Sequence, residues 1–326
     1  MTAVSIIGAG AWGAALALAA LRAGRSVALL SMCDDQGVPF SPPHEYVKYA
    51  ASIPGNSSFQ LTTDINAAAA QADLIVLVPP AQHMRSTCAL FQGLIGPTVP
   101  LIIASKGIED TSVLLMSDVV KEFFPDNPIL VLSGPSFAED VSQNLPTAVS
   151  LAGDSLCLSE KIAGLLGSPF FHLYPSTDLV GTQIGGAIKN VIAIACGIVE
   201  GRGLGDNVRA AVVARGLVEL ARLGQKMGAQ PETFLGLAGV GDITLTCYCG
   251  KSRNQSFGYA LGQGTPLKEL LASKSSLTEG VYTVAGAIVL AKRHQVDMPL
   301  TFALSQLLQG EINVEEFLSL LLKRVV

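Results

Sequence analysis

A single lysine stands out in the second half of the chain because apolar residues surround it. Lys189 is the only charged residue between Asp178 and Glu200. If this stretch is helical, Gly185 and Gly186 lie one turn before the lysine on the same side, where small residues would leave room for a ligand beside the ammonium. Apolar surroundings without a counter-charge make an amine easier to deprotonate, which suits proton transfer near neutral pH. Lys189 is therefore a candidate general acid or base. The alternative is a lysine that extends to solvent or pairs with a structural acid.

A second group of polar residues follows further along the chain. Asp242 lies in the glycine-rich stretch LAGVGDITLT at 237–246, and the triplet Ser252-Arg253-Asn254 comes soon after it. An arginine fork, together with hydroxyl, amide and helix-start N–H groups, can bind a phosphate oxyanion. The plainer interpretations are a turn residue for Asp242 and a solvated helix cap for the triplet. The residues alone leave both alternatives open.

Three glycines near the amino terminus have the G-x-G-x-x-G spacing of a dinucleotide-binding turn. Gly8, Gly10 and Gly13 lie between an apolar run at 4–7 and a helix-like segment at 14–22. In such a turn the first glycine allows the sharp bend, the second lets a pyrophosphate approach the backbone, and the third lets the helix pack close to the strand. The negative ligand then lies at the positive end of the helix. Because the strand–turn–helix context is present, we predict dinucleotide binding.

The same opening stretch is apolar enough to raise two other interpretations. No charged side chain precedes Arg22, yet a secretion signal requires a positive start, and this one has only its α-amine. A membrane helix would not be interrupted by the three glycines. Gly24 fits the end of the helix, and residues 27–30 fit a second strand. We therefore predict the first βαβ unit of a nucleotide-binding fold.

Four further apolar, β-branched runs indicate strands that are buried on both faces of a sheet. They occupy residues 74–78, 101–104, 129–132 and 148–151. Helix-compatible segments at 81–91 and 112–124 lie between them, which is typical of a parallel α/β sheet. The short spacing before residues 169–174 predicts antiparallel additions at the end of the sheet.

Beyond about residue 178 the pattern becomes helical and stays so to Val326. The predicted fold class is therefore α/β, with an N-terminal Rossmann-like, mostly parallel sheet domain and a C-terminal all-helical domain. We expect the dinucleotide-binding domain to span residues 1–180 and the helical substrate-binding domain to span residues 181–326.

The main strands end in clusters of small or rigid residues. These clusters are Pro79-Pro80, Ser105-Lys106-Gly107 and Ser133-Gly134-Pro135-Ser136. Ligands of open α/β sheets bind at the carboxyl edge of the strands, so the three loops are predicted to line one crevice. After the second strand, Asp34 and Asp35 lie late for a ribose-binding acid, and no arginine follows closely. The choice between NAD and NADP therefore stays open.

Composition excludes several classes of protein. The 326 residues suit two domains, and 49% hydrophobic with 14% charged residues argues against disorder. A net charge of −5 without a basic stripe gives no support for nucleic-acid binding. Cys247 and Cys249 form an isolated C-x-C pair and the histidines are not grouped, so we predict no metal site. Scattered, reduced thiols favour a cytoplasmic protein.

Taken together, these motifs resemble those of the bacterial NAD(P)-dependent glycerol-3-phosphate dehydrogenase family. The resemblance runs nearly end to end, in order and at similar separations. It rests on GAGAWG at 8–13, SKG at 105–107, SGPSFA at 133–138, GGAIKNVIAI at 185–194, GVGDITLT at 239–246, KSRN at 251–254 and LTEG at 277–280. It implies reversible hydride transfer between NAD(P)H and dihydroxyacetone phosphate, which supplies glycerophospholipid synthesis.

The resemblance also implies a role for individual residues. Lys189 matches the general acid/base, and Asp242 is expected to hold Lys189 or a substrate hydroxyl in place. The substrate-binding positions are Lys106, Gly134, Ser136, Lys189, Asp242, Ser252, Arg253 and Asn254. The cofactor-binding positions are Gly8, Gly10, Ala11, Trp12, Gly13, Lys106, Ala138, Arg253, Leu277 and Glu279. Related enzymes are often homodimers, and the same is expected here.

This chain departs from the family pattern at three places. Ala11 stands where a serine is common, and Met32 stands near a common arginine, so an NADP preference does not follow. Residues 34–58 match the family poorly.

The alternative in the same class is a β-hydroxyacid dehydrogenase or ketopantoate-type reductase, whose carboxylate substrates fit the Ser252–Asn254 triplet less well. An alternative of another class is a non-catalytic, dinucleotide-binding redox sensor. We expect no metal, nucleic-acid partner or stable membrane insertion.

Overall fold

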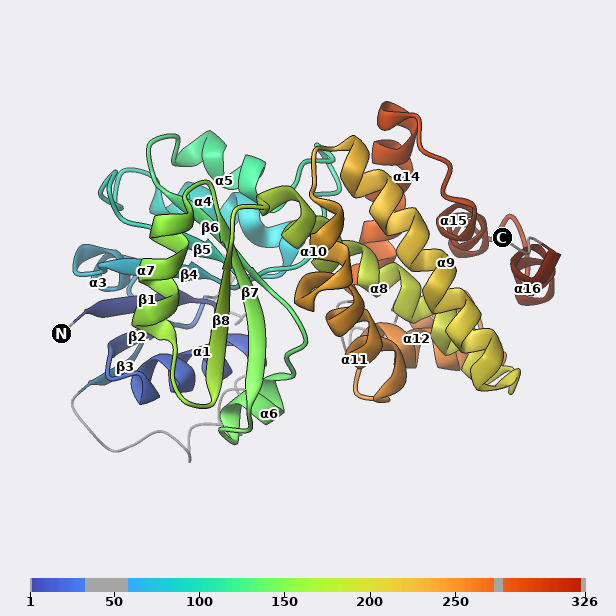
Figure 1. Ribbon diagram of the computed structural model, residues 1–326, viewed down its shortest axis with the longest axis horizontal. Helices are drawn as coiled ribbons and strands as arrows, with labels where there is room; N and C mark the ends of the chain where they lie inside the picture. The colour runs from blue at the N-terminus through green and yellow to red at the C-terminus, as the bar shows by residue number, and fades with distance from the viewer. Residues whose placement is uncertain (1, 33–57, 273–277, 324–326) are drawn as a thin grey trace. The chain divides into compact units, whose positions relative to one another are not determined.

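The computed structural model describes residues 2–32, 58–272 and 278–323, which form two compact units (Figure 1). The first unit contains Met1–Ser105 and Met116–Leu179, and the second contains Lys106–Leu115 and Val180–Val326. The units thus divide one residue before the predicted boundary. The segment Lys106–Leu115 differs from the expectation, because it belongs to the second unit although its sequence lies inside the first. The cause is burial, since Ile108 and Leu115 are part of the apolar core of the second unit.

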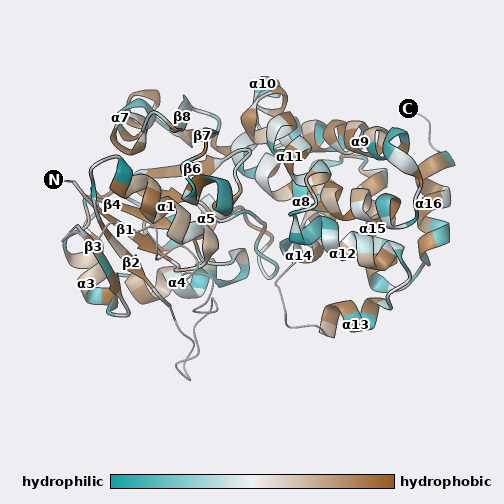
Figure 2. Cartoon of the chain, turned by 90° about the horizontal axis from the view of Figure 1, so that it is seen from below, coloured by the Kyte–Doolittle hydropathy of each residue, from teal (hydrophilic) through white to brown (hydrophobic). Residues whose placement is uncertain are grey.

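The first unit is built on one eight-stranded sheet of order β3-β2-β1-β4-β5-β6-β7-β8. Its strands are β1 (Ala3–Ile7), β2 (Ser26–Leu30), β3 (Phe59–Thr62), β4 (Leu74–Leu77), β5 (Leu101–Ile103), β6 (Ile129–Ser133), β7 (Thr147–Gly153) and β8 (Phe171–Ser176). The first six are parallel, whereas β7 runs antiparallel to β6 and carries β8 parallel to itself. The predicted α/β class and the antiparallel end of the sheet are confirmed. The strands are mostly brown in Figure 2, as expected for strands covered on both faces.

Helices cover both faces of this sheet. They are α1 (Ala11–Arg22), α3 (Ile65–Ala70), α4 (Met84–Phe91, preceded by the 3-10 turn η1 at Ala81–His83), α5 (Met116–Phe123), α6 (Ala138–Ser142) and α7 (Leu156–Leu166). α1 packs beside α6, and α4 packs beside α5. The Arg22 guanidinium, in the last turn of α1, donates to the carbonyl oxygens of Val141 (2.8 Å) and Ser142 (2.5 Å), so charge at the helix ends joins α1 to α6.

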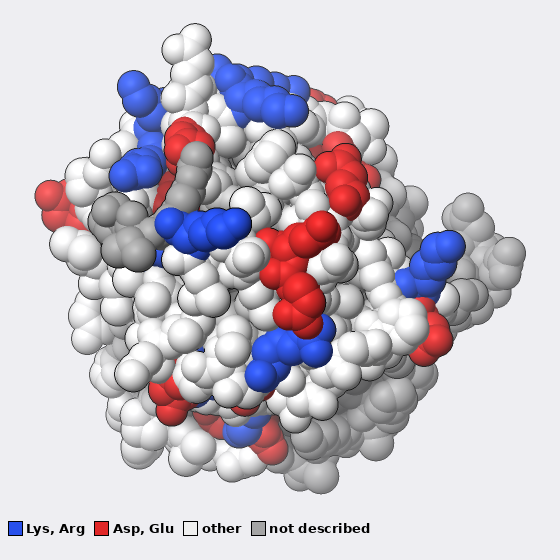
Figure 3. All heavy atoms as spheres, turned by 90° about the vertical axis from the view of Figure 1, so that its right-hand side faces the viewer, with Lys and Arg blue, Asp and Glu red and all other residues white. Residues whose placement is uncertain are grey.

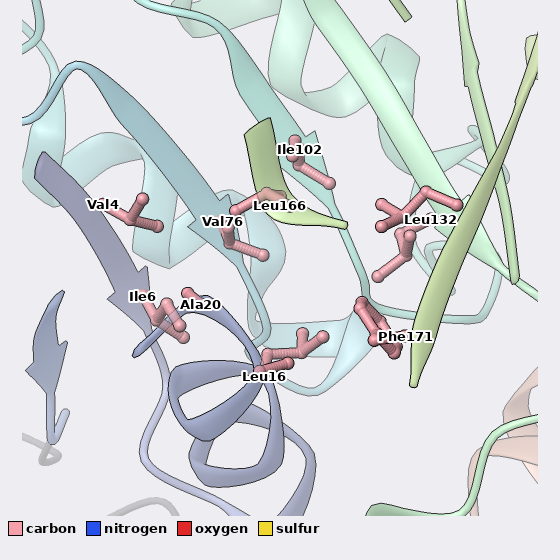
Figure 4. A pocket seen from close by; sticks show the side chains of 11 residues that line it. Val4, Ile6, Leu16, Ala20, Val76, Ile102, Leu132, Leu166 and Phe171 are labelled. Carbon is pink, nitrogen blue, oxygen red and sulfur yellow. The ribbon is translucent and has the colours of Figure 1, made fainter. Parts of the chain in front are cut away.

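A small cavity inside the first unit is a gap in its core and carries no chemistry. In Figure 4 the side chains of Val4, Leu16, Val76 and Phe171 point towards it, from β1, α1, β4 and β8. All of its lining residues are apolar. Ligand sites combine apolar walls with a few placed polar groups, which this cavity lacks. The candidate site must therefore be sought elsewhere.

The second unit is helical. Its helices are α8 (Leu179–Gly201), α9 (Gly205–Lys226), α10 (Pro231–Leu235), α11 (Asp242–Tyr248), α12 (Arg253–Gly262), α13 (Leu267–Ala272), α14 (Glu279–His294), α15 (Pro299–Gln309) and α16 (Val314–Lys323), with the π-turn η2 at Leu237–Gly241. Among the described residues, α8 alone has the length and hydropathy of a membrane span, but 89% of that window is buried within the protein. Its apolar residues belong to the unit's core, so α8 is a central core helix.

A buried carboxylate holds α15 against α9. Glu219 of α9 accepts hydrogen bonds from the backbone N–H groups of Leu300 (2.5 Å) and Thr301 (3.0 Å) and from the Thr301 hydroxyl (2.8 Å). These donors lie in the first turn of α15, whose own N-cap residue, Met298, supplies no side-chain bond. A carboxylate from another helix therefore takes the place of the usual cap.

We expect Glu219→Ala to lower the free energy of unfolding by about 1–3 kcal/mol, because it leaves buried donors of α15 without an acceptor. Chemical denaturation would measure this. Glu160→Ala, at an exposed position of helix α7, is the control and should change stability by less than about 0.5 kcal/mol. Equal stability of the two variants would contradict the capping role.

Candidate active site

The glycine turn of the first unit has the geometry that its spacing predicts. Gly8 has a φ of +119°, and a Cβ there would lie 2.9 Å from the carbonyl oxygen of Val78. A Cβ on Gly13 would lie 1.8 Å from the carbonyl oxygen of Gly8, so only glycine lets α1 approach the end of β1 this closely. Gly10 is the N-cap of α1 and contributes no side-chain cap. The turn therefore needs glycine at positions 8 and 13 to take this shape.

The remaining candidate residues of the first unit follow the ends of β1 and β6. Ala11 and Trp12 form the first turn of α1, and Ala138 is the first residue of α6. Gly134 has a φ of +149°, and a Cβ there would meet Val149 Cα at 2.9 Å. The Ser136 hydroxyl donates to the carbonyl oxygen of Gly134 at 3.1 Å. Both turns thus lie at the carboxyl edge of one sheet, where its ligands are expected.

Two lysines in the second unit share one buried carboxylate. Lys189 Nζ lies 2.5 Å from Asp242 Oδ1, and Lys106 Nζ lies 2.7 Å from Asp242 Oδ2. The Asp242 side chain is only 1% exposed, whereas the lysine side chains keep 11% (Lys189) and 18% (Lys106) of their surface open. The Thr246 hydroxyl accepts a hydrogen bond from Lys189 at 3.1 Å and donates one to the carbonyl oxygen of Asp242 at 2.6 Å. We call these four residues the lysine–aspartate cluster.

The charges of this cluster shift two of its proton equilibria. Burial lowers the pKa of the Lys106 ammonium to about 8; attraction to Asp242 opposes this shift, and the neighbouring charge of Lys189 adds to it. Burial acts to raise the pKa of the Asp242 carboxyl, but the two ammonium groups outweigh it and lower that pKa below its ordinary value. Asp242 is therefore an anion at neutral pH, and the cluster carries a net positive charge when both lysines are protonated.

Close packing places the start of α11 against α8. A Cβ on Gly185 of α8 would lie 2.0 Å from the carbonyl oxygen of Ala238, in the turn that precedes Asp242. The prediction that Gly185 leaves room for a ligand is therefore wrong, because this backbone fills the space. Gly185 instead lets the turn approach α8, which brings Asp242 to Lys189.

Lys106 reaches the cluster on a short arm of chain, Lys106–Leu115. The arm closes on itself through a β-bridge between Ile108 and Leu115, and Ile108 packs where Gly286 of α14 has no side chain. A Cβ on Gly286 would lie 2.8 Å from Ile108 Cγ2. The arm also explains why α5 begins at Met116 rather than at residue 112 as predicted.

The Ser252–Asn254 triplet begins α12. Ser252 is its N-cap and accepts from the backbone N–H of Gln255 at 3.3 Å, as the plainer interpretation predicts, but it is buried rather than solvated. Asn254 is buried, and its Oδ1 accepts from the backbone N–H of Gly280 at 2.9 Å. Arg253 is exposed in the first turn of α12. The hydrogen bond between the Asn254 side chain and the Gly280 backbone thus connects the triplet to the first turn of α14.

Several residues of the predicted cofactor site lie at or beyond the ends of the described ranges. Glu279 is half-buried at the start of α14, but Leu277 lies outside the described residues, as do Asp34 and Asp35. Met32 is buried, and its Sδ accepts a weak hydrogen bond from the Thr87 hydroxyl of α4 at 3.8 Å. The side chain of Met32 therefore packs in the interior.

Comparisons with known proteins identify the family. The description "NAD-dependent glycerol-3-phosphate dehydrogenase N-terminus" matches residues 3–157, and the corresponding C-terminus matches residues 178–319. The chain belongs to this family. It is 42% identical over 98% of its length to glycerol-3-phosphate dehydrogenase [NAD(P)+] of Parvibaculum lavamentivorans, covering 96% of that protein. It is 44% identical over 98% of its length to the protein of the same name from Caulobacter vibrioides, covering 97% of it.

Solved structures agree with this assignment. Glycerol-3-phosphate dehydrogenase from Coxiella burnetii superposes with a TM-score of 0.89 at 33% identity, over 99% of both chains. A ketopantoate reductase from Ralstonia eutropha JMP134 gives a TM-score of 0.58 at 15% identity, over 97% of this chain and 99% of that one. The second likeness shows a shared fold only, so the chain is assigned to the dehydrogenase family rather than to the ketopantoate-type reductases, the runner-up.

For this glycerol-3-phosphate dehydrogenase family member, the structure adds one residue that the sequence reasoning missed. Thr246 lies one helical turn after Asp242, a spacing that places both on the same side of α11 and could have flagged it. The described residues contain no group of three or more histidine, cysteine or acidic side chains that could hold a metal ion. Cys247 is buried and Cys249 is exposed.

Proposed function

We propose that this protein interconverts dihydroxyacetone phosphate and sn-glycerol 3-phosphate, with NAD(H) or NADP(H) as the redox partner. The observation that carries the proposal is the lysine–aspartate cluster, in a chain that matches the family along its length. A buried carboxylate that holds two ammonium groups suits a carbonyl oxygen that gains negative charge. The runner-up, a ketopantoate-type reductase, is supported by fold likeness alone.

The residues of the first unit fit a dinucleotide. At the glycine turn, any side chain on Gly13 would fill the space between α1 and Gly8, and the N-terminus of α1, which begins at this turn, favours an anionic group. Gly8, Gly10 and Gly13 would form the turn around the pyrophosphate. Other proposed contacts, by family resemblance, are Ala11, Trp12, Lys106, Ala138, Arg253, Leu277 and Glu279. When bound, the nicotinamide supplies or accepts the hydride.

The chain's own part in the reaction is to hold and move one proton. Lys189 donates a proton to the ketone oxygen during reduction and takes it back during oxidation. Asp242 fixes the direction of that ammonium through the 2.5 Å contact, and Thr246 accepts a further hydrogen bond from it. Lys106 adds a second positive charge beside the same carboxylate, which favours a developing oxyanion.

The start of α12 is proposed to bind the phosphoryl group. Arg253 supplies a charged fork in the first turn, and the Ser252 hydroxyl can still donate its proton while it accepts from Gln255. The amide oxygen of Asn254 already accepts a hydrogen bond from the backbone N–H of Gly280. Its NH₂ group is therefore the part of the side chain that can donate to an anion. Binding the phosphate away from the reacting carbon uses remote binding energy to orient the substrate.

A direct assay tests the proposal. The protein is mixed with dihydroxyacetone phosphate and NADH or NADPH, and the cofactor absorbance is followed; a parallel run uses ketopantoate. We expect oxidation of the reduced cofactor with the phosphorylated ketone and much slower oxidation with ketopantoate. Faster turnover of ketopantoate would favour the runner-up, and cofactor binding without turnover of either substrate would favour the redox sensor. The NADH and NADPH rates also decide the cofactor preference that Met32 leaves open.

We also infer a cytoplasmic homodimer that supplies glycerophospholipid synthesis. Support comes from family resemblance and from the five described cysteines, which form no disulfide with one another. On the face seen in Figure 3, blue and red residues are interspersed, without the basic stripe that nucleic-acid binding requires. Light scattering of the purified protein would test the oligomeric state, and a monomeric mass at micromolar concentration would overturn the dimer.

A further inference from the structure

The short turn before α12 is held by one buried glutamine. Gln255 is 2% exposed, and its Oε1 accepts from the backbone N–H of Gly250 at 3.2 Å. Its own backbone N–H donates to Ser252 Oγ at 3.3 Å. Gln255 therefore binds both ends of the turn from Gly250 to Ser252, through its side chain at one end and its backbone at the other.

The other end of the glutamine amide is anchored to α8. Gln255 Nε2 donates to Glu200 Oε2 at 2.6 Å. The same carboxylate oxygen lies 3.3 Å from Arg209 Nη1, and Arg209 lies over the Tyr248 ring at 4.3 Å. A hydrogen bond to a charged acceptor is stronger than one between neutral groups, so the direction of the Gln255 amide is well defined.

Backbone packing makes this anchor stiff. A Cβ on Gly197 of α8 would lie 2.1 Å from the carbonyl oxygen of Gln255, and a Cβ on Gly258 of α12 would lie 2.0 Å from the carbonyl oxygen of Ile194. The two helices therefore touch through their backbones at the level of Gln255. Within the turn, Gly250 and Lys251 are exposed and Gly250 has a φ of +65°, so the hydrogen bonds from Gln255 to both ends of the turn help to define its shape.

We propose that Gln255 is a positioning residue that, with Glu200 as its anchor, fixes the Gly250–Ser252 turn so that Ser252 and Arg253 are presented to the phosphoryl group. This inference rests on the proposed function of the triplet. Gln255 itself touches no substrate. It acts by removing the turn's freedom, so that the loss of conformational entropy on binding a phosphate is smaller.

The first test replaces the glutamine by a residue of similar size. Gln255→Leu removes both side-chain hydrogen bonds. We expect KM for dihydroxyacetone phosphate, at saturating reduced cofactor, to rise about 10-fold or more while kcat changes by less than about 3-fold. This split is expected because the lysine–aspartate cluster does not depend on the turn. A general loss of structure would lower the fraction of active protein and hence the apparent kcat instead.

A reversal of the hydrogen bond between residues 200 and 255 makes the test independent of folding defects. Gln255→Glu alone places two carboxylates where Nε2 and Oε2 now lie 2.6 Å apart, and it should raise KM as strongly as Gln255→Leu. The double variant Glu200→Gln/Gln255→Glu restores a donor–acceptor pair with reversed direction, and its glutamate still accepts from Gly250. We expect KM of the double variant to return to within about 3-fold of the parent value.

Gln263, the C-cap residue of α12, provides a control with the same type of side chain. Its Nε2 donates to the carbonyl oxygen of Gly201 at 2.7 Å, so it also joins α12 to α8, but at the far end from the turn. Gln263→Leu should lower thermal stability without changing KM. An equal rise in KM for Gln255→Leu and Gln263→Leu, or no rescue in the double variant, would overturn the inference. If the unmodified protein did not turn over dihydroxyacetone phosphate, the proposed function would fail instead, so the two failures are distinguishable.

Discussion

Replacing Lys189 by alanine should lower turnover of dihydroxyacetone phosphate by about 10²–10⁴-fold, the range that a general acid contributes. The ammonium lies 2.5 Å from Asp242 and keeps 11% of its surface open, so it is both oriented and accessible to a ligand. In Lys189→Ala the Thr246 hydroxyl, 3.4 Å from that carboxylate oxygen, stays in place but carries no charge. Lys106 stays on the opposite oxygen, held by the arm.

Cofactor binding separates this loss from a structural one. Lys189 belongs to the second unit, whereas the glycine turn belongs to the first, so the dissociation constant of NADH, measured by fluorescence, should stay within about 3-fold of the parent value. Lys226→Ala, in the exposed last turn of α9, is the control and should keep full activity. A Lys189→Ala variant that retains most of its turnover would show that the proton comes from elsewhere.

Local sequence patterns were sufficient to predict the main secondary-structure elements of both units. The G-x-G-x-x-G turn, the parallel strands and the end of the sheet near residue 178 follow from hydrophobic runs and glycine spacing, and the structure has them. Strand β3, Phe59–Thr62, was missed because it is a short edge strand with two exposed positions, Gln60 and Leu61, and no continuous apolar run. Its pairing with β2 is a long-range contact that no local pattern records.

In the candidate site, too, long-range contacts could not be predicted from local sequence patterns. The isolated charge of Lys189 marked it from sequence, but nothing near Lys106 in the chain indicates that it pairs with Asp242. That pairing requires the Lys106–Leu115 arm to join the second unit, which depends on the missing side chain of Gly286. Gly185 was misread for a related reason, because a small residue leaves space for either a ligand or a backbone, and sequence does not distinguish them.

The second large effect is expected at Asp242. Asp242→Asn keeps the shape of the side chain but removes the negative charge from between two ammonium groups that are mostly buried. Breaking a buried ion pair in this way lowers the free energy of unfolding by about 3–5 kcal/mol. The loss is smaller here to the extent that water reaches the lysines. Because the Lys189 ammonium also loses the acceptor that orients it, we expect turnover to fall by about 10²-fold or more. The matched control is Asp206→Asn, whose partner Arg209 also lies at 2.5 Å but whose own side chain is 83% exposed. That variant should behave like the parent protein.

The direction in which Asp242→Asn shifts the pH profile of kcat/KM tests the electrostatics of the lysine–aspartate cluster. Attraction to Asp242 raises the pKa of Lys106, which burial and Lys189 hold down at about 8. Without the carboxylate this pKa must fall further, so Lys106 loses its positive charge at a lower pH. Reduction of dihydroxyacetone phosphate needs a protonated, positively charged cluster, and the alkaline limb of kcat/KM should therefore shift to lower pH in the variant. A shift to higher pH, or an unchanged limb, would mean that Asp242 does not sustain the charge of the cluster.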